Sequence, residues 1–203
     1  MDQIFLLSPA RCDGVRARQL LNPAAAFELA ERLRGREGAP LGEVFSFLSG
    51  LYFRGKLSYA GAFGRRAPGT PASLVITTDR GLVPPEHAVW RDDLIAFSGV
   101  DIAAGDARYV TPLRRDAEQL AASIGAATRV VLLGSIATGK YADILMEIFE
   151  DRLVFPIDFV GRGDMSRGGL LLRCVREGRE LDYQPVVGAI RRGRRPPKLE
   201  RPR

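Results

Sequence analysis

The chain contains few of the residues from which metal sites and disulfide frameworks are built. Its 203 residues include two cysteines, Cys12 and Cys174, and one histidine, His87. Two thiols cannot form the disulfide framework of a small secreted domain, and one imidazole does not complete a usual zinc ligand set with them. We therefore expect reduced thiols and no bound metal ion.

Long apolar runs are also missing. No apolar stretch approaches the roughly 18 residues that a membrane-spanning helix needs. The first apolar run, Ile4 to Leu7, is short and follows Asp2 and Gln3, which is not the pattern of a signal peptide. We expect a cytoplasmic protein that has no membrane partner.

Acidic residues are outnumbered, and the basic ones are nearly all arginine. The 30 basic residues include 27 arginines against 24 acidic residues, which gives a net charge of +6 and a pI of about 9.8. Such a surface attracts polyanions, but GC-rich coding alone also produces an arginine excess. The apolar fraction of 46% is ordinary for a soluble globular protein with a buried core.

Short apolar runs alternate with stretches of helical spacing. Strands are predicted at Ile4–Leu7, Leu74–Thr78, Val130–Leu133 and Leu153–Phe155, with another possible one at Leu170–Val175. Helices are predicted at 23–34, 43–52, 111–124 and 138–149, whereas 55–63 fits either a helix or a strand. The alternation predicts a single three-layer α/β domain over residues 1–189, with a mainly parallel central sheet flanked by helices. Residues 190–203 form a basic, Pro/Arg-rich tail that we expect not to pack.

The strands are followed by segments rich in glycine, hydroxyl and charged residues. They are 8–14, 77–85, 134–141 and 156–168, and the last includes Gly161-Arg162-Gly163-Asp164-Met165-Ser166-Arg167-Gly168. Glycine allows backbone N–H groups to approach a ligand, and arginine can bind phosphate or base oxygens through two donors. Because ligands of parallel α/β sheets bind beyond the carboxyl ends of the strands, we expect these segments to form one site.

Cys12 is the candidate nucleophile of that site. It lies between Arg11 and Asp13 in a predicted loop, and a nearby guanidinium lowers the pKa of a thiol. Asp13 can transfer a proton, or it can repel the thiolate, depending on its orientation. The alternative is an unreactive loop cysteine. Cys174, which follows three leucines, is interpreted as a core residue.

Two other segments contain residue types that are typical of binding or catalytic sites. The segment from Gly134 to Lys140 resembles a phosphate-binding loop, but it lacks the glycine spacing and the Gly-Lys-Ser/Thr ending of nucleotide hydrolases. A strand exit that leads into a helix can nevertheless hold one nucleic-acid phosphate. His87 lies in a Pro-rich loop, where a surface histidine is a simpler interpretation than a general base.

Three segments resemble the YaaA-like proteins of the peroxide-stress family. They are the apolar run into Leu7-Ser8-Pro9-Ala10-Arg11-Cys12, the segment 76–85 (ITTDRGLVPP), and Val131-Leu132-Leu133-Gly134 leading into 140–145 (KYADIL). The likeness covers most of residues 3–175, although each motif is short. The Arg162–Arg167 segment and the basic tail depart from it. Within this group the chain is most similar to the DpdC-like proteins of bacterial systems that place 7-deazaguanine bases in DNA.

The resemblance implies a DNA modification enzyme that hydrates the nitrile of 7-cyano-7-deazaguanine in DNA to the 7-amido base, without a cofactor. Its partners are DNA and other proteins of the same system. Cys12 would add to the nitrile while Asp13 or Asp164 moves protons; otherwise a carboxylate activates water directly. Residues expected to bind the substrate are Ser8, Arg11, Thr77, Asp79, Arg80, Gly134, Ser135, Lys140, Tyr141, Gly161, Arg162, Gly163, Ser166 and Arg167. Two alternatives stay open: a DNA-binding stress-protection module without chemistry, and a base-excising glycosylase.

Overall fold

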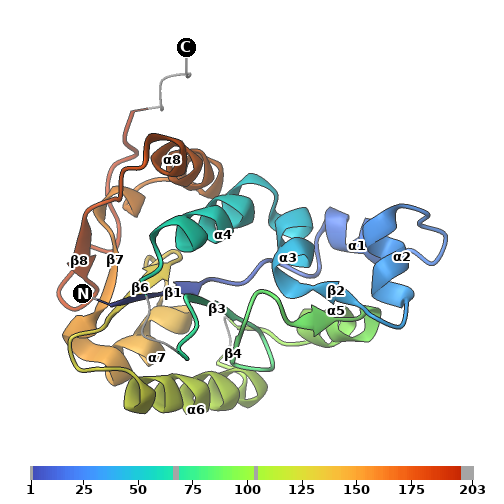
Figure 1. Ribbon diagram of the computed structural model, residues 1–203, viewed down its shortest axis with the longest axis horizontal. Coiled ribbons are helices and arrows are strands. Elements are labelled where there is room, and N and C mark those ends of the chain that lie inside the picture. Colours follow the sequence, from blue (N-terminus) through green and yellow to red (C-terminus); the bar gives the residue numbers. More distant parts are fainter. Residues whose placement is uncertain (1, 66–68, 103–104, 198–203) are drawn as a thin grey trace.

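A six-stranded sheet runs through the middle of the molecule in the order β4-β3-β1-β6-β7-β8 (Figure 1). The computed structural model describes residues 2–65, 69–102 and 105–197. The strands of this sheet are β1 (Gln3–Leu7), β3 (Ser73–Ile76), β4 (Leu82–Val83), β6 (Arg129–Leu133), β7 (Leu153–Pro156) and β8 (Tyr183–Pro185). The four inner strands are parallel, and β4 and β8 pair antiparallel at the two edges. The predicted α/β fold with a mainly parallel sheet is confirmed.

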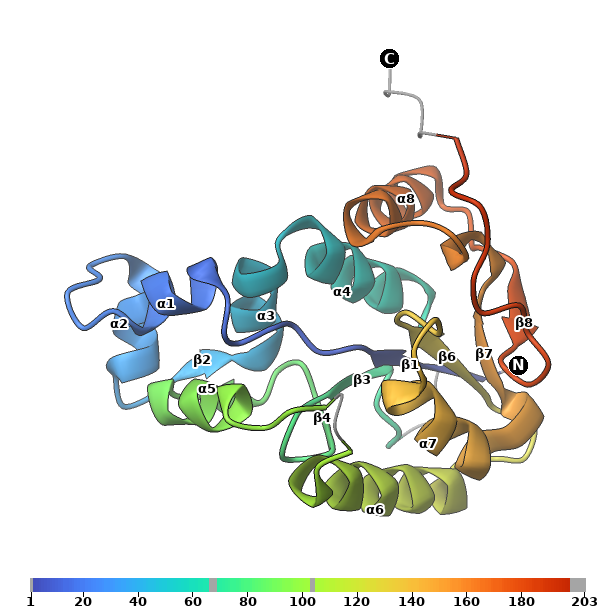
Figure 2. The same cartoon turned by 180° about the vertical axis from the view of Figure 1, so that it is seen from behind.

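Helices cover both faces of the sheet. The α-helices are α1 (Val15–Leu21), α2 (Glu28–Arg34), α3 (Leu41–Ser49), α4 (Leu51–Phe63), α5 (Arg91–Ser98), α6 (Ala107–Ser123), α7 (Gly139–Phe149) and α8 (Asp164–Glu177). Helices α4 and α8 lie on one face, and α6 and α7 lie on the other (Figures 1 and 2). Beside the sheet, α1, α2, α3 and α5 surround a short ladder of β2 (Ala39–Pro40) and β5 (Ala88–Val89). Two 3-10 turns, Glu150–Arg152 and Ile157–Phe159, flank β7.

The inner strands were predictable because both of their faces are covered. Every residue of β1 is buried, and it pairs with β3 on one side and with β6 on the other. A strand that is buried on both faces reads as an uninterrupted apolar run rather than as an alternating one. All four apolar runs that we assigned as strands occur at the expected positions.

The C-terminal third differs from the prediction. Residues from Asp164 to Glu177 form one helix, α8, so Leu170–Val175 is not a strand, and Asp164, Ser166 and Arg167 are not in a loop. Cys174 is fully buried as predicted, but it lies on this helix. Elsewhere 55–63 belongs to α4, and α6 begins one turn before Thr111 with Asp106 as its cap. Glycines and mixed charges at the start of α8 conceal its helical spacing.

The connections of β1 and β6 lead away from each other. Strand β3 follows β1 on one side of it, whereas β6 follows on the other side and continues to β7. In open parallel sheets this change of direction leaves a crevice beyond the carboxyl ends of the two diverging strands. Here those ends are Leu7 and Leu133, which are direct register partners.

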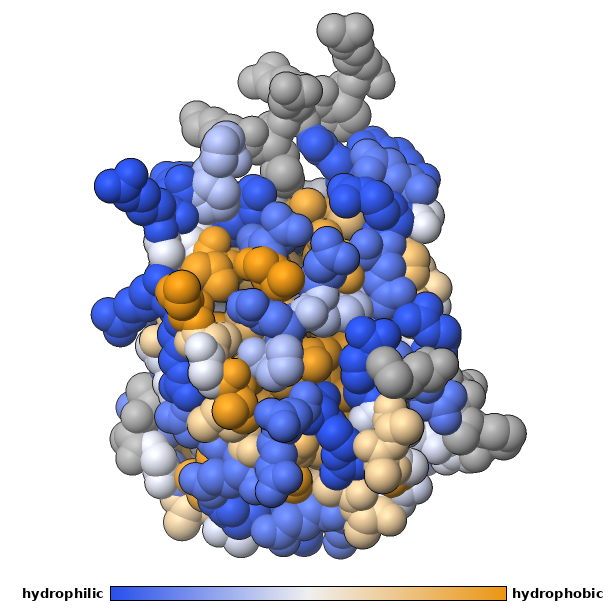
Figure 3. All heavy atoms as spheres, turned by 90° about the vertical axis from the view of Figure 1, so that its left-hand side faces the viewer, coloured by the Kyte–Doolittle hydropathy of each residue, from blue (hydrophilic) through white to orange (hydrophobic). Residues whose placement is uncertain are grey.

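The tail runs along the outside of the domain beside β8 and α8 (Figure 1). Most of its described residues are exposed, and it contacts the domain at two points. Arg191 forms an ion pair with Asp143 at 2.7 Å, and the Arg194 carbonyl lies against Gly161. On this side of the molecule hydrophilic side chains surround small apolar patches (Figure 3). The end of the tail (198–203) lies outside the described residues.

Candidate active site

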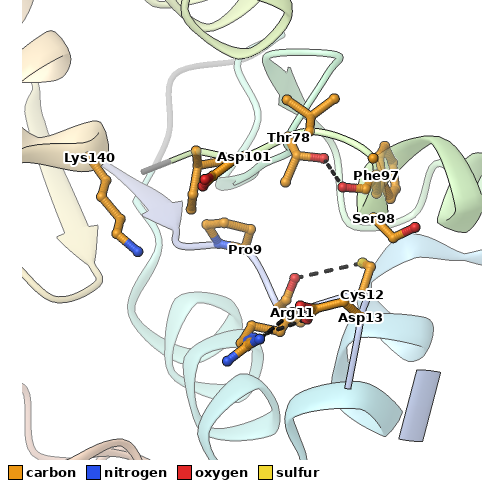
Figure 4. Close-up of a pocket in the computed structure, with 13 residues that line it drawn as sticks. Pro9, Arg11, Cys12, Asp13, Thr78, Phe97, Ser98, Asp101 and Lys140 are labelled. Atoms are coloured by element: carbon orange, nitrogen blue, oxygen red, sulfur yellow. Dashed lines mark hydrogen bonds and ion pairs between the residues drawn. The ribbon is translucent and has the colours of Figure 1, made fainter. Parts of the chain in front are cut away.

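A cavity of about 360 Å³ opens where the ends of β1 and β6 diverge. Its lining comes from the β1 exit, the end of α3, α4, the β6 exit and the first residue of α8. The lining residues are Ser8, Pro9, Ala10, Arg11, Leu48, Ser49, Tyr52, Ile102, Ser135, Thr138, Lys140, Tyr141 and Asp164. A second cavity of about 540 Å³ shares part of this wall and extends past Cys12 toward Phe97 (Figure 4). Three of the four strand exits that we predicted to meet therefore border one cavity, and the fourth contributes Thr78 to its neighbour.

Ser8 lines the first cavity and forms a buried pair with Lys56, which lies behind the lining. Lys56 comes from α4 and donates a hydrogen bond to the Ser8 carbonyl at 2.6 Å, and its Nζ lies 2.9 Å from Ser8 Oγ. Only 1% of Lys56 and 6% of Ser8 are exposed. The Lys56 ammonium position also lies 4.6 Å from the ring centres of Tyr52 and Phe53. An amine in such contact with a hydroxyl can accept its proton.

The protonation of Lys56 is set by its surroundings. Burial lowers the pKa of Lys56 from the ordinary 10.5 to about 7, because a charged ammonium loses its hydration there. The Asp164 carboxylate opposes this change in pKa, and the Arg167 guanidinium adds to it. Near neutral pH a large fraction of Lys56 is therefore a neutral amine. Serine hydroxyls are activated as nucleophiles by an adjacent base of this kind.

Tyr141, which belongs to α7, lines the cavity next to Ser8. Its hydroxyl accepts a hydrogen bond from the Ser135 backbone N–H at 2.8 Å and contacts the Ser8 hydroxyl. A Cβ at Gly134 would lie 2.8 Å from Tyr141 Oη and 3.0 Å from Ser8 Cβ, so a larger residue there would push the two hydroxyls apart. Burial raises the pKa of Tyr141, which keeps its hydroxyl protonated. These predicted binding residues thus hold Ser8 in place.

Helix α8 places Arg167 beside the pair. The Arg167 guanidinium is buried, donates to the Phe159 carbonyl at 2.9 and 3.2 Å, and lies 3.4 Å from the Asp164 carboxylate. Helices α4 and α8 approach closely here, since a Cβ at Gly55 would lie 2.8 Å from the Gly168 carbonyl oxygen. A helix rather than a loop therefore carries the predicted residues Asp164, which lines the cavity, and Arg167, which lies beside Asp164.

Cys12 does not have the environment of a nucleophile. Its side chain is buried, and its Sγ lies 3.7 Å from the Ala10 carbonyl, to which it donates (Figure 4). Burial raises the pKa of this thiol to about 12, and the Asp13 and Asp79 carboxylates add to the effect. A thiol with this pKa is protonated at neutral pH. The lowering of its pKa by Arg11 that we expected does not occur, because Arg11 turns to Asp13 instead.

Several residues that were predicted to bind the substrate form ion pairs or hydrogen bonds with neighbouring residues instead. Arg11 and Asp13 form an exposed ion pair at 2.8 Å, and this pairing lowers the pKa of Asp13. The Thr77 hydroxyl donates to the Gly81 carbonyl and closes a turn. The Arg80 guanidinium lies 2.5 Å from Asp93 and 3.4 Å from Asp79, above the Phe97 ring. In these contacts Thr77 and Arg80 hold the chain after β3 rather than face the cavity.

The segment before α8 is also largely engaged in local contacts. Gly161 adopts φ +73° next to the tail, and Gly163 is the residue that precedes α8. The Arg162 side chain is 11% exposed, donates to the Ser166 hydroxyl at 3.3 Å and lies 3.9 Å from Asp158. Among the predicted cations, Lys140 is exposed and borders both cavities (Figure 4). His87 is exposed on the surface, in line with the simpler interpretation.

Lys56 and Tyr52 are the site residues that sequence reasoning missed. They are four residues apart and share the buried face of α4 with Phe53, Tyr59 and Ala60. A lysine in the middle of an apolar helical stripe is rare unless it is paired, and this was the available signal. The sequence does not reveal this stripe because 55–63 fits either a helix or a strand.

Within the described residues, no three His, Cys, Asp or Glu side chains gather in a way that could hold a metal ion. The same part of the chain has no helix that is long and apolar enough to cross a membrane. Comparison of the chain with models of known protein families, with curated proteins and with solved structures found no match. The function of the site is therefore inferred from its own residues and their geometry.

Proposed function

We propose that the protein is an enzyme that adds water to an electrophilic carbon, with Ser8 as the nucleophile and Lys56 as its base. The observation that supports this most directly is the contact of 2.9 Å between Lys56 Nζ and the Oγ of Ser8, a residue that lines the cavity. Nucleophile, base and orienting groups come from separate elements, as they do in established covalent hydrolases. Cys12 is replaced in this role because its thiol is buried and protonated.

The substrate that fits the sequence resemblance is DNA that carries 7-cyano-7-deazaguanine. Ser8 Oγ bonds to the nitrile carbon as its proton passes to Lys56 and from there to the nitrile nitrogen, which gives an imidate ester. Water then adds to the imidate carbon and loses a proton to the Asp164 carboxylate, which borders the same cavity. The carbon–Ser8 bond breaks, the hydroxyl regains a proton, and the product is the 7-amido base. The net change is one water added.

The size and charge of the site are compatible with a nucleobase on a polyanion. Cavities of 360 and 540 Å³ are within the range of roughly 300–1,000 Å³ that holds small ligands. Lys140 at the shared wall and the net charge of +6 favour a phosphate backbone at the entrance. Burial of a lysine beside a serine lowers the stability of the fold, and a module that only binds DNA gains nothing in return. The non-catalytic alternative is therefore less suitable.

The test is the incubation of the protein with an oligonucleotide that carries the cyano base, followed by mass spectrometry of the released nucleosides. We expect a nucleoside heavier by one water with the wild-type protein and with Cys12→Ala. Ser8→Ala and Lys56→Met should form none, while their affinity for the oligonucleotide stays close to that of the wild type. Full activity of Ser8→Ala would refute Ser8 as the nucleophile. Loss of the free base instead of hydration would identify a glycosylase.

A further inference from the structure

Within the part of the chain that the structure describes, the buried O–H of Tyr52 has no hydrogen-bond acceptor. Tyr52 is 5% exposed, and its Oη makes no hydrogen bond of acceptable geometry within the described residues. The residue borders the same cavity as Ser8 and Asp164. A buried hydroxyl that lacks a partner costs about 1–3 kcal/mol, so its retention at a cavity points to a ligand atom that completes it.

The surroundings of Tyr52 make its hydroxyl a hydrogen-bond donor. Burial raises the pKa of Tyr52, and this keeps the phenol protonated at any physiological pH. The Arg167 guanidinium lies next to the Tyr52 oxygen, but an arginine only donates hydrogen bonds, so it does not accept one from the Tyr52 O–H. The Tyr52 ring is fixed by an edge contact with Phe159 at 6.3 Å between centroids and by Lys56 over its face. The donor is therefore held in place before any ligand arrives.

Addition of a nucleophile to a nitrile or a carbonyl moves negative charge onto the heteroatom of that group. Enzymes stabilise this charge with donors that are already in position, and loss of one such donor lowers the rate by about 10²–10³-fold. In the described site, Ser8 and Lys56 supply the nucleophile and the base, while Tyr141 is already bonded to Ser135 and Ser8. Tyr52 is the buried donor that remains free to bind this heteroatom.

We propose that the Tyr52 hydroxyl binds the substrate heteroatom that becomes negatively charged when Ser8 attacks, and that Tyr52 is thus a further catalytic residue. The inference rests on the proposed role of Ser8 as the nucleophile but not on the identity of the nucleobase in the substrate. It holds for the nitrile nitrogen of a cyano base and for the oxygen of a carbonyl or phosphoryl group.

The experiment uses a fluorophosphonate, which reports on the serine centre without any nucleobase. Ser8 Oγ bonds to phosphorus, fluoride leaves, Lys56 accepts the proton, and the phosphoryl oxygen takes the place of the charged heteroatom. Labelling of Ser8 is followed by intact-protein and peptide mass spectrometry. The control is Tyr59→Phe, which removes a hydroxyl from the same helix that is bonded to Leu181 N at 2.7 Å, away from the cavity.

We expect Tyr52→Phe to be labelled about 10²-fold more slowly than the wild type, and Tyr59→Phe to be labelled at the wild-type rate. The factor by which Tyr52→Phe lowers the labelling rate should be the same at every pH. Recovery of its rate at higher pH would show that Tyr52 acts only by altering the basicity of Lys56, and equal rates for Tyr52→Phe and wild type would overturn the inference. If the wild type gives no Ser8 adduct, the nucleophile itself is wrong. An adduct without hydration of cyano-DNA would refute the substrate alone.

Discussion

Replacement of Lys56 by methionine should change how the stability of the protein depends on pH. Lys56 has a pKa of about 7 in the folded protein and the ordinary 10.5 when it is solvated. This difference corresponds to about 5 kcal/mol of destabilisation when both states are protonated, at about 1.4 kcal/mol for each pH unit. The figure is an upper limit, because water that penetrates a core reduces the cost of a buried charge.

The direction in which stability changes with pH follows from the number of protons bound by the folded and unfolded states. Between about pH 7 and 10.5 the unfolded chain holds a proton on Lys56 that the folded chain does not hold, so stability rises with pH across this window. Below the folded pKa both states are protonated, and the penalty is constant. Lys56→Met has no such group, and its loss of the Ser8 hydrogen bonds, worth about 1–2 kcal/mol, is independent of pH.

The assay is urea unfolding of the wild type, Lys56→Met and the control Lys140→Met at several pH values. From about pH 7.5 to about pH 9 the wild type should gain about 2 kcal/mol relative to Lys56→Met. Lys140 is exposed at the edge of the cavity, so Lys140→Met should run parallel to the wild type. Other titrating groups cancel in these differences. If the curves of wild type and Lys56→Met are parallel, Lys56 is not a neutral amine and the proposed base is lost.

Three further predictions concern the thiol, the helix contact and the form of the substrate. Cys12 should react with iodoacetamide at neutral pH only after unfolding, since burial raises its pKa to about 12; rapid alkylation of the native protein, read by mass spectrometry, would contradict this. Gly168→Leu should lower the free energy of unfolding by about 3 kcal/mol or more in urea titrations, because its Cβ would lie 2.6 Å from the Leu51 carbonyl oxygen; stability equal to that of the wild type would exclude the close contact. Single-stranded cyano-DNA should be hydrated faster than duplex DNA, because Ser8 is 6% exposed and a base must leave the helix to reach it; equal initial rates in the same nucleoside assay would contradict this.

The fold was predictable where the burial of an element produces a recognisable pattern in the local sequence. The apolar runs of β1, β3, β6 and β7 have both faces covered, and this also fixed the edge at which a site forms. Helix α8 was missed because its first turns combine glycine, aspartate and arginine, which locally resemble a binding loop. The contacts of Gly168 with α4 that require glycine are visible only once both helices are in place.

The candidate site was predicted in its location but not in its chemistry. Ser8, Tyr141, Asp164 and Arg167 were expected at the ligand edge, and all are found at or beside the cavity. Cys12 was favoured because an adjacent arginine was expected to activate it, but sequence order does not show where a side chain turns. Lysine normally lies on surfaces, so the role of Lys56 emerges only from the tertiary contact that buries it.

The close contact between Gly55 and Gly168 also determines when, during synthesis, the site can become reactive. Ser8 and Lys56 are translated long before α8, and a lysine that is still hydrated keeps its ordinary basicity and stays protonated. Only when α8 docks on α4, with Gly168 against Leu51 and Gly55, is Lys56 enclosed beside Arg167. A nascent chain on the ribosome therefore carries the nucleophile without its base, and reactivity arises as the last helix completes the domain.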